Sequence, residues 1–355
     1  MKEYDKINDV NYLVSVIIPT YKGSKNICRA LRSIENQSYP NIEVIIVDDN
    51  GKKTDEQIKT ETTIKAVKWN FNYKYIVHEI NKNGAVARNT GIKLAKGNYI
   101  CFLDDDDVYF PEKIKLSVEC LEENKDIDAC FSGVLLRRNE KFVDYIIPRK
   151  LENIQKELMF NGSMFGTGSN IFVRASVLRA VNGFDERYIR HQDLEFLLRV
   201  FEKFKYIVIP DILIIKDNDS FVNNIPKYWK MKETKAMYYN DFKFIIDRWS
   251  NKEQNDYYMQ ECASLLKDCF GVENKESIFD AVVNIKKYRK LTLKERLGVL
   301  LTGIKVKDKN IYYYLRSIYV KLLKRNLNLN FDILDKANKL INIYDDNKKK
   351  SVQTI

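Results

Sequence analysis

Between residues 13 and 124, continuous apolar runs alternate with stretches in which apolar residues recur at helical spacing. Four apolar runs predict buried strands, at residues 13–20, 41–51, 73–79 and 98–103. Three amphipathic stretches predict helices, at residues 24–38, 84–97 and 111–124. This alternation is typical of an α/β domain with a mostly parallel sheet flanked by helices.

The pattern changes after residue 128. Residues 128–138 and 206–210 read as strands, and residues 192–204 read as a helix. From about residue 226 onward the pattern is mainly helical and rich in Lys, Asn and Tyr. We therefore expect an α/β domain over residues 1–220 and a mainly helical region over residues 221–355.

The charge of the chain is distributed unevenly. The whole sequence has 60 Lys and Arg against 49 Asp and Glu, a net charge of +11. Residues 1–220 contain 33 of each sign, whereas residues 286–325 contain 13 basic and 2 acidic side chains. The excess positive charge therefore lies in one C-terminal segment. This suggests that the segment is an appendage of a neutral body and that it binds a partner of its own.

Cysteine usage and the termini bear on location. None of the six cysteines forms a CxxC pair, which favours free thiols in a reducing compartment. The N-terminal stretch MKEYDKINDVNY lacks the apolar centre of a signal peptide, and no apolar run approaches the length that spans a bilayer. These features predict a cytoplasmic protein, located at the inner face of the cell membrane if the basic segment docks there.

Four consecutive acids, Asp104 to Asp107, follow the fourth predicted strand in the stretch CFLDDDDVYF. Ligands bind just beyond the carboxyl ends of parallel strands, and clustered carboxylates there offer the hard oxygen ligands that Mg²⁺ or Mn²⁺ prefers. The alternative is that Asp107 and one other acid cap the helix that begins near Pro111. Capping uses one or two of the four acids and leaves the others without a role.

Two further motifs lie at neighbouring strand ends. Asp48 and Asp49 end the second strand, where a carboxylate can bind a base or sugar of a nucleotide or can simply form a turn. Arg88 lies one turn into the short helix of NGAVARNTG, where a guanidinium and helix amides suit an anionic diphosphate. Taken alone, this pattern is equally consistent with an arginine on the surface of a helix that binds no ligand.

The stretch RHQDLEF places Asp193 at the start of the helix over residues 192–204. A carboxylate in this position can act as a general base, or it can cap the helix. His191, one of two histidines, is interpreted as a polar loop residue rather than a metal ligand.

Taken together, these motifs resemble the family-two inverting glycosyltransferases, whose fold is the nucleotide-binding GT-A fold. The resemblance covers about residues 13–215 in the usual order and spacing: VSVIIPTYKGS and VIIVDD, then NGAVARNTGIKLAKGNYICFLDDDD, then GSNIFVRASVLRAVNGFDERYIRHQDLEF. It implies a single-addition transferase, because the chain lacks the membrane spans and the Gln-x-x-Arg-Trp motif of the processive members.

The resemblance also implies roles for individual residues. Asp106 matches the principal metal ligand of the family's DxD motif, and Asp104 or Asp105 helps to hold the metal or the ribose. Asp193 matches the catalytic base, although Gln192 stands where a glutamate is usual. The remaining matches are to positions that contact the nucleotide-sugar: Pro19, Thr20, Tyr21, Asp49 and Arg88.

The implied reaction transfers a sugar, with inversion, from a nucleotide-sugar to a hydroxyl of a glycan or lipid-linked acceptor, using Mn²⁺ or Mg²⁺. UDP-sugars are the default donor, and bacterial surface polysaccharide synthesis is the implied setting. A nucleotidyltransferase is an alternative, but TYKGSKN has only one glycine where that class needs a Gly-rich signature. A non-catalytic protein that binds an anionic polymer leaves the acid clusters unexplained, and nucleic acid is not an expected partner.

The basic segment over residues 286–325 interleaves Leu and Tyr with its bases. A helix from Ile311 would place Leu315, Ile318 and Leu322 on one face, with bases toward the other. Such a helix can lie on an anionic membrane surface. It can equally pack its apolar face on protein, and both interpretations stay open from sequence.

Overall fold

The structure is a computed structural model, in which the chain forms two compact units. It describes the following residues: 12–138, 140–162, 164–217, 228–269, 275–293, 295–296, 299 and 331–352. The first unit combines Met1–Ser220 with Asn328–Ile355, and the second is Phe221–Leu327. We expected all of residues 221–355 to form one C-terminal region, but the last helix belongs with the first unit.

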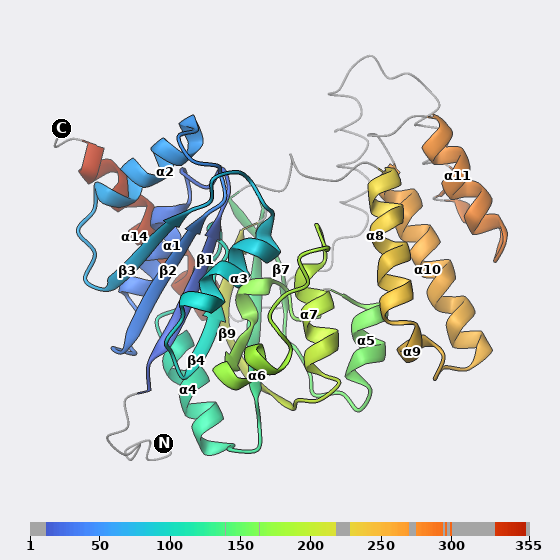
Figure 1. Ribbon diagram of the computed structural model, residues 1–355, viewed down its shortest axis with the longest axis horizontal. Coiled ribbons are helices and arrows are strands. Elements are labelled where there is room, and N and C mark those ends of the chain that lie inside the picture. The colour runs from blue at the N-terminus through green and yellow to red at the C-terminus, as the bar shows by residue number, and fades with distance from the viewer. Residues whose placement is uncertain are drawn as a thin grey trace. The chain divides into compact units, whose positions relative to one another are not determined.

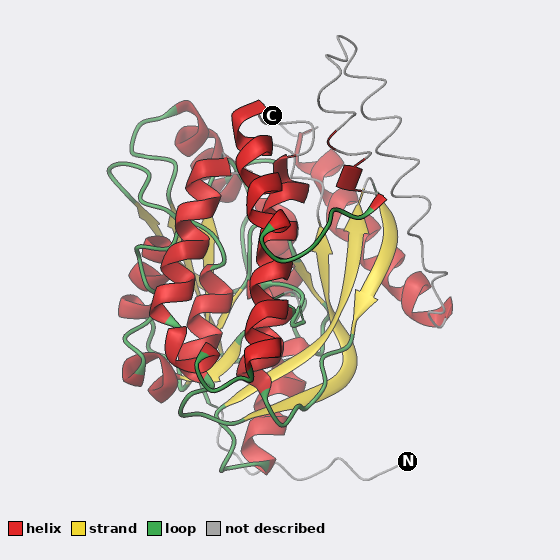
Figure 2. Cartoon of the chain, turned by 90° about the vertical axis from the view of Figure 1, so that its right-hand side faces the viewer, coloured by secondary structure: helices red, strands yellow, loops and turns green. Residues whose placement is uncertain are grey.

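Nine strands of the described chain form one mixed sheet in the first unit (Figure 2). Their order is β3-β2-β1-β4-β8-β6-β9-β5, and β7 pairs with β6. The strands span β1 Val14–Thr20, β2 Ile42–Asp48, β3 Asn72–Val77, β4 Tyr99–Phe102, β5 Val108–Tyr109, β6 Ala129–Arg138, β7 Lys141–Ile146, β8 Phe172–Arg174 and β9 Tyr206–Asp217.

The first four strands are parallel, which confirms the predicted strands and their alternation with helices. Beyond β4 the sheet is mixed, because β8 pairs antiparallel with both β4 and β6 while β6 and β9 are parallel. An apolar run shows that a strand is buried but not which way it runs, so this change of direction has no sequence signal.

Helices flank the sheet (Figure 1), and alternate residues of β1 pack against different helices. Val14, Val16 and Ile18 join one core with the helices α1 Ile27–Glu35, α4 Lys113–Glu123 and α14 Phe331–Val352. On the other side, Ile17 packs against Gly91 of α3, where a Cβ would come within 2.4 Å of the isoleucine side chain. The first unit also contains α2 Asp55–Lys65, α3 Gly84–Leu94, α5 Ile154–Phe160, η1 Gly168–Asn170, α6 Ala175–Ala180 and α7 Gln192–Val200.

The second unit is helical in its described part, as predicted. Its helices are α8 Tyr228–Asp241, α9 Lys243–Ile246, α10 Asn251–Cys269 and α11 Lys275–Lys286. Met231, Leu266 and Ile285 share its core. No helix among the described residues is long and apolar enough to cross a bilayer. Residues 301–330, which include most of the basic segment and its predicted amphipathic helix, lie outside the described residues.

A fully buried lysine, Lys113, begins α4 without a carboxylate partner in the described structure. Its Nζ lies 3.3 Å from Ser132 Oγ. Burial lowers the pKa of this amine. Because the unfolded chain then binds a proton more readily, Lys113 reduces stability most below its folded pKa, and this cost disappears as the pH rises toward the unfolded value.

We expect Lys113→Met to increase the free energy of unfolding at neutral pH by about 1–3 kcal/mol, because a methionine of similar length removes a poorly solvated polar group. The parent should recover part of this difference as the pH rises toward about 10. Urea denaturation of both proteins across this pH range measures the effect. Lys115→Met, at an exposed position of the same helix, is the control, and a destabilised Lys113→Met protein would contradict the interpretation.

Candidate active site

The four acids form a tight turn directly after β4. The Asp107 amide donates to the Asp104 carbonyl over 3.0 Å, and the turn follows the buried Leu103. Asp104, Asp105 and Asp106 are half-buried, whereas Asp107 is buried. The partners of Asp104, Asp105 and Asp107 come from different parts of the chain.

Asp105 is held by the last residue of β1 and the loop that follows it. Thr20 Oγ1 donates to Asp105 Oδ2 over 2.5 Å, and the Tyr21 backbone also hydrogen bonds to this carboxylate. Gly23 makes the approach possible, because a Cβ at this position would lie 1.8 Å from Asp105 Oδ2. Burial, and then the charge of Asp106, raises the pKa of Asp105 to about 8.

Asp107 is bound to residues distant in the sequence and does not cap a helix. Its Oδ2 accepts hydrogen bonds from Thr167 Oγ1 at 2.8 Å and Ser169 Oγ at 2.6 Å, and its Oδ1 accepts one from the Asp217 amide at 3.2 Å. Helix α4 begins after Glu112 with no side-chain cap. The capping interpretation of Asp107 is therefore wrong, because its carboxylate is used inside the site.

Arg88 connects the acid turn to the start of α7. Its Nη2 donates to Asp104 Oδ1 over 2.6 Å, and its Nη1 donates to Gln192 Oε1 over 2.9 Å. The amide nitrogen of Gln192 donates in turn to the Tyr188 carbonyl over 2.9 Å. Gln192 thus acts as acceptor and donor at once, which a glutamate carboxylate could not do.

Gly168 lies among the three predicted functional groups. A Cβ built on it would be 3.7 Å from Arg88 Nη2, 3.8 Å from Asp193 Cβ and 3.9 Å from Asp104 Oδ2. Residues distant in the sequence are therefore brought to one place. The Asp193 carboxylate, in the first turn of α7, makes no hydrogen bond or ion pair with any described residue, and the N-cap position belongs to His191.

Asp49 holds the segment that leads into α3. Its Oδ1 accepts from the Lys82 amide at 2.8 Å and lies 2.7 Å from His78 Nδ1. Its Oδ2 accepts from Asn81 Nδ2 and the Asn83 amide, both at 2.9 Å. Because all these bonds fix the entry to α3, Asp49 positions Arg88 indirectly. A direct contact of Asp49 with a nucleotide stays a prediction.

The neighbouring predicted residues take up different positions. Asp48 accepts from its near neighbour Asn50 and from Tyr75 Oη, so it forms the local turn. Pro19 pairs in register with Val47 inside the parallel sheet, and the Tyr21 side chain is 42% exposed. Of these three side chains, Tyr21 is the most exposed.

The acid turn fits a divalent cation bound partly by substrate. No set of three or more His, Cys, Asp or Glu side chains in the described structure could hold a metal alone. Mg²⁺ takes only one or two protein carboxylates and completes its shell with phosphate and water. Burial, and then the charge of Asp106, raises the pKa of Asp105, and a cation bound nearby would favour the charged form of this carboxylate.

Several residues of this site were not predicted from the sequence. Gly23 lies against the Asp105 carboxylate, and Gly168 lies among Arg88, Asp104 and Asp193. Thr167 and Ser169 donate hydrogen bonds to Asp107. The stretch GTGSN, a small-residue loop just before a short strand, was the available signal. Sequence spacing alone does not tell which acid such a loop will meet.

Comparison with known proteins agrees with this geometry. The family model described as Glycosyl transferase family 2 matches residues 15–181. The amylovoran biosynthesis glycosyltransferase AmsB of Erwinia amylovora is 34% identical over 212 residues, which cover 57% of this chain and 68% of AmsB. The UDP-Glc:alpha-D-GlcNAc-diphosphoundecaprenol beta-1,3-glucosyltransferase WfgD of Escherichia coli is 29% identical over 143 residues, covering 40% of this chain and 53% of WfgD.

Among solved structures, S. aureus TarS 1-349 in complex with UDP-GlcNAc aligns with a TM-score of 0.50 at 18% identity, covering 82% of this chain and 79% of TarS. At that identity the likeness shows the fold, which is GT-A. The chain belongs to glycosyltransferase family 2. The resemblance seen in the sequence is thereby confirmed, and the relative AmsB is named for amylovoran biosynthesis.

We expect Gly23→Ala to weaken binding of UDP with Mn²⁺ at least about tenfold, because the new methyl group displaces Asp105 from Thr20 and charge-assisted hydrogen bonds are strong. Calorimetry measures the affinity. Ser24→Ala, which removes only a 3.3 Å bond to Glu56 in the same loop, is the matched control. Equal affinity of the Gly23→Ala protein and the parent would show that the Thr20–Asp105 contact does not shape the donor site.

Proposed function

We propose that this protein transfers one sugar, with inversion at the anomeric carbon, from a UDP-sugar to a hydroxyl of a glycan or lipid-linked acceptor. The observation that carries the proposal is the meeting of Arg88, Asp104 and Asp193 around Gly168. The guanidinium of Arg88, the carboxylate of Asp104 and the unengaged carboxylate of Asp193 match the needs of a metal-bound diphosphate leaving group and a hydroxyl nucleophile.

The donor end of the site comprises Thr20, Tyr21, Arg88 and the acid turn. Arg88 would bind the diphosphate by exchanging or sharing its bond to Asp104, and Asp49 would keep α3 in place. Asp106 and Asp104 would hold Mn²⁺ or Mg²⁺. When bound, this ion neutralises charge on the leaving diphosphate. The family membership, together with the UDP-sugars in the names of TarS complexes and WfgD, supports a UDP-sugar donor.

Asp193 would act as the general base. It would accept the proton of the acceptor hydroxyl as the oxygen attacks the anomeric carbon from the face opposite the diphosphate. Its carboxylate has no described partner that must first be displaced. Gln192 next to it fixes Arg88, so the base and the diphosphate-binding cation share one rigid connection at the start of α7.

The acceptor is proposed from the relatives. AmsB belongs to amylovoran biosynthesis, and WfgD is named for a diphosphoundecaprenol-linked acceptor. A growing glycan or a lipid-linked oligosaccharide of a bacterial surface polysaccharide fits both names. A thermal-shift screen of nucleotide-sugars, nucleoside triphosphates and oligonucleotides, with and without Mn²⁺, tests the class. Stabilisation by nucleoside triphosphates alone would favour a nucleotidyltransferase instead.

We expect Asp106→Ala to abolish the Mn²⁺-dependent part of UDP binding, because a hard oxygen ligand is lost from the acid turn. Calorimetry with UDP, with and without Mn²⁺, separates this part from metal-free binding. Asp126→Ala, at an exposed acid paired with Lys205, should behave like the parent. Unchanged Mn²⁺-dependent affinity in Asp106→Ala would remove Asp106 from the metal site.

We expect Asp193→Asn to keep donor affinity and to lose about 100-fold or more in turnover, because an amide cannot accept the hydroxyl proton. UDP affinity and UDP release from the active donor should be measured on the same preparation. Asp211→Asn, at an exposed position on β9, is the control. Turnover within about tenfold of the parent is too small a loss for a general base.

A further inference from the structure

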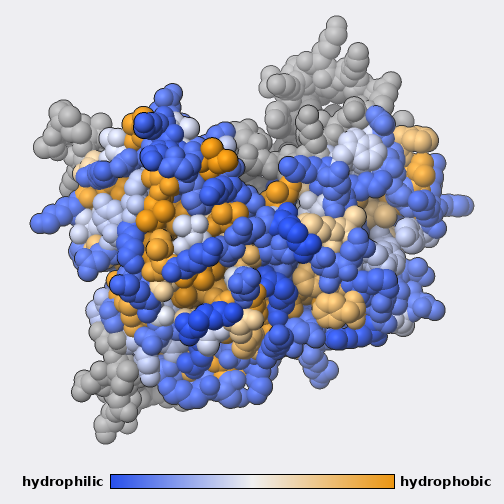
Figure 3. All heavy atoms as spheres, viewed as in Figure 1, coloured by the Kyte–Doolittle hydropathy of each residue, from blue (hydrophilic) through white to orange (hydrophobic). Residues whose placement is uncertain are grey.

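Helix α11 has two apolar faces, and one of them has no partner in the described structure. Ile278, Ala281 and Ile285 are buried in the core of the second unit. On the opposite side of the helix, Phe279 is 71% exposed and Val283 is 40% exposed. Hydrophobic side chains accordingly reach the surface over α11 (Figure 3). A helix that only packed on its own unit would need one apolar face.

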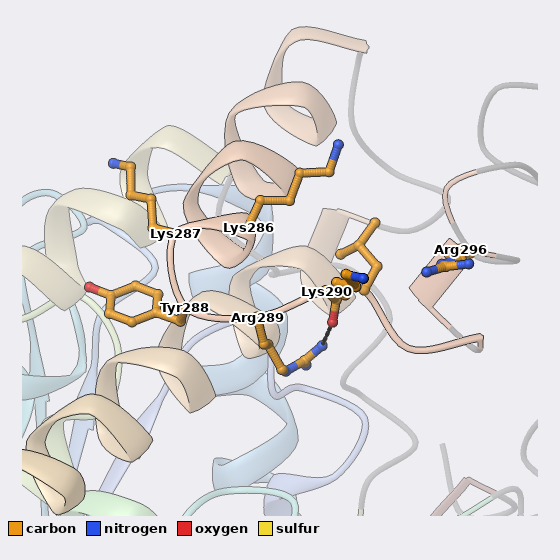
Figure 4. A pocket seen from close by; sticks show the side chains of 7 residues that line it. Lys286, Lys287, Tyr288, Arg289, Lys290 and Arg296 are labelled. Carbon is orange, nitrogen blue, oxygen red and sulfur yellow. Dashed lines mark hydrogen bonds between the residues drawn. The ribbon is translucent and has the colours of Figure 1, made fainter.

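The exposed apolar face continues into a cluster of positive charge. Lys286 follows Phe279 and Val283 at helical spacing and is exposed. With Lys290 and Arg296 it lines a cavity of about 640 Å³ at the end of the helix (Figure 4). We call Phe279, Val283, Lys286, Lys290 and Arg296 the α11 surface.

The positive charge of this surface is not neutralised within the described chain. Lys286, Lys290 and Arg296 form no ion pair with any described residue. Arg289, by contrast, is paired with Glu295 at 2.7 Å and also donates to the Lys290 carbonyl. Among the described residues from 276 to 296, Glu276 is the only exposed acid. The surface therefore presents net positive charge beside exposed apolar side chains.

We propose that the α11 surface docks on an anionic lipid bilayer. Phe279 and Val283 would enter the boundary between headgroups and acyl chains, and Lys286, Lys290 and Arg296 would contact headgroup phosphates. The combination of exposed apolar and basic side chains favours a bilayer over an anionic polymer. An anionic polymer would use the three bases but would leave a phenylalanine and a valine in water, whereas a bilayer satisfies both kinds of side chain.

This surface is distinct from the helix that the sequence predicted from Ile311, and it rests on described residues alone. It is also independent of the proposed sugar transfer, since it lies in the second unit. If the acceptor is lipid-linked, docking would bring the enzyme to the surface where that acceptor is found. Loss of docking should then leave UDP binding intact, so the two proposals fail separately.

The test is flotation of the full-length protein with vesicles of phosphatidylcholine alone or mixed with phosphatidylglycerol, at low and high salt. We expect binding to the anionic vesicles that weakens with salt. Phe279→Ser with Val283→Ser should weaken it about tenfold, and Lys286→Glu with Lys290→Glu and Arg296→Glu should weaken it at least tenfold. All positions are exposed, so the melting temperature and UDP affinity should match the parent.

The matched control reverses three exposed lysines of the first unit, Lys52→Glu, Lys59→Glu and Lys65→Glu, and so changes net charge by the same amount. This control should still bind anionic vesicles more strongly than the triple variant of the α11 surface. Dextran sulfate, added as a soluble polyanion, provides a second arm. Parent-like vesicle binding by the Phe279/Val283 variant, or equal loss in the control, would overturn the proposal, as would binding of dextran sulfate without vesicle binding.

Discussion

Four adjacent carboxylates in one turn are the constraint around which the catalytic unit is organised. Left together without partners they would repel one another and lose solvation as the turn becomes buried. The fold stabilises Asp104, Asp105 and Asp107 with separate hydrogen-bond partners. Arg88 of α3 pairs with Asp104, Thr20 at the end of β1 bonds to Asp105, and the loop before β8 bonds to Asp107. Each of these bonds brings a different part of the chain to the end of β4, so stabilising the acids also assembles the site.

Ser169 shows how this coupling works. Its hydroxyl donates to Asp107 and accepts the amide hydrogen of Asp104 over 2.9 Å, so it ties two members of the turn to one loop. Gly168 directly precedes it and therefore comes to lie among Arg88, Asp104 and Asp193. The position at which we place the reacting groups is thus fixed by a hydrogen bond to an acid that itself takes no part in the chemistry.

Local features of the site could be predicted from the sequence, and long-range ones could not. Polar residues lie at or just beyond the ends of β1, β2 and β4. Parallel strands bring such ends together, so Thr20, Asp49 and Asp104 could be placed at one edge from pattern alone. The bond from Ser169 to Asp107 spans 62 positions and the bond from Asp217 to Asp107 spans 110. A periodic pattern of apolar residues does not indicate which distant residues will form such pairs. For the same reason Asp107 read as a helix cap, which is the local role that its neighbours suggested.

Gln192 shows why a departure from the family pattern can be consistent with the same chemistry. A glutamate there would give Arg88 two carboxylates to neutralise it, Asp104 and the new one. The glutamine gives it one carboxylate and one neutral oxygen, at 2.6 and 2.9 Å. Arg88 therefore keeps more of its positive potential for an anionic ligand, while two hydrogen bonds hold its guanidinium in place. The amide also bonds to the Tyr188 carbonyl, which a carboxylate would repel. A glutamine at this position thus leaves the site less negative than a glutamate would, and it bonds to both Arg88 and Tyr188.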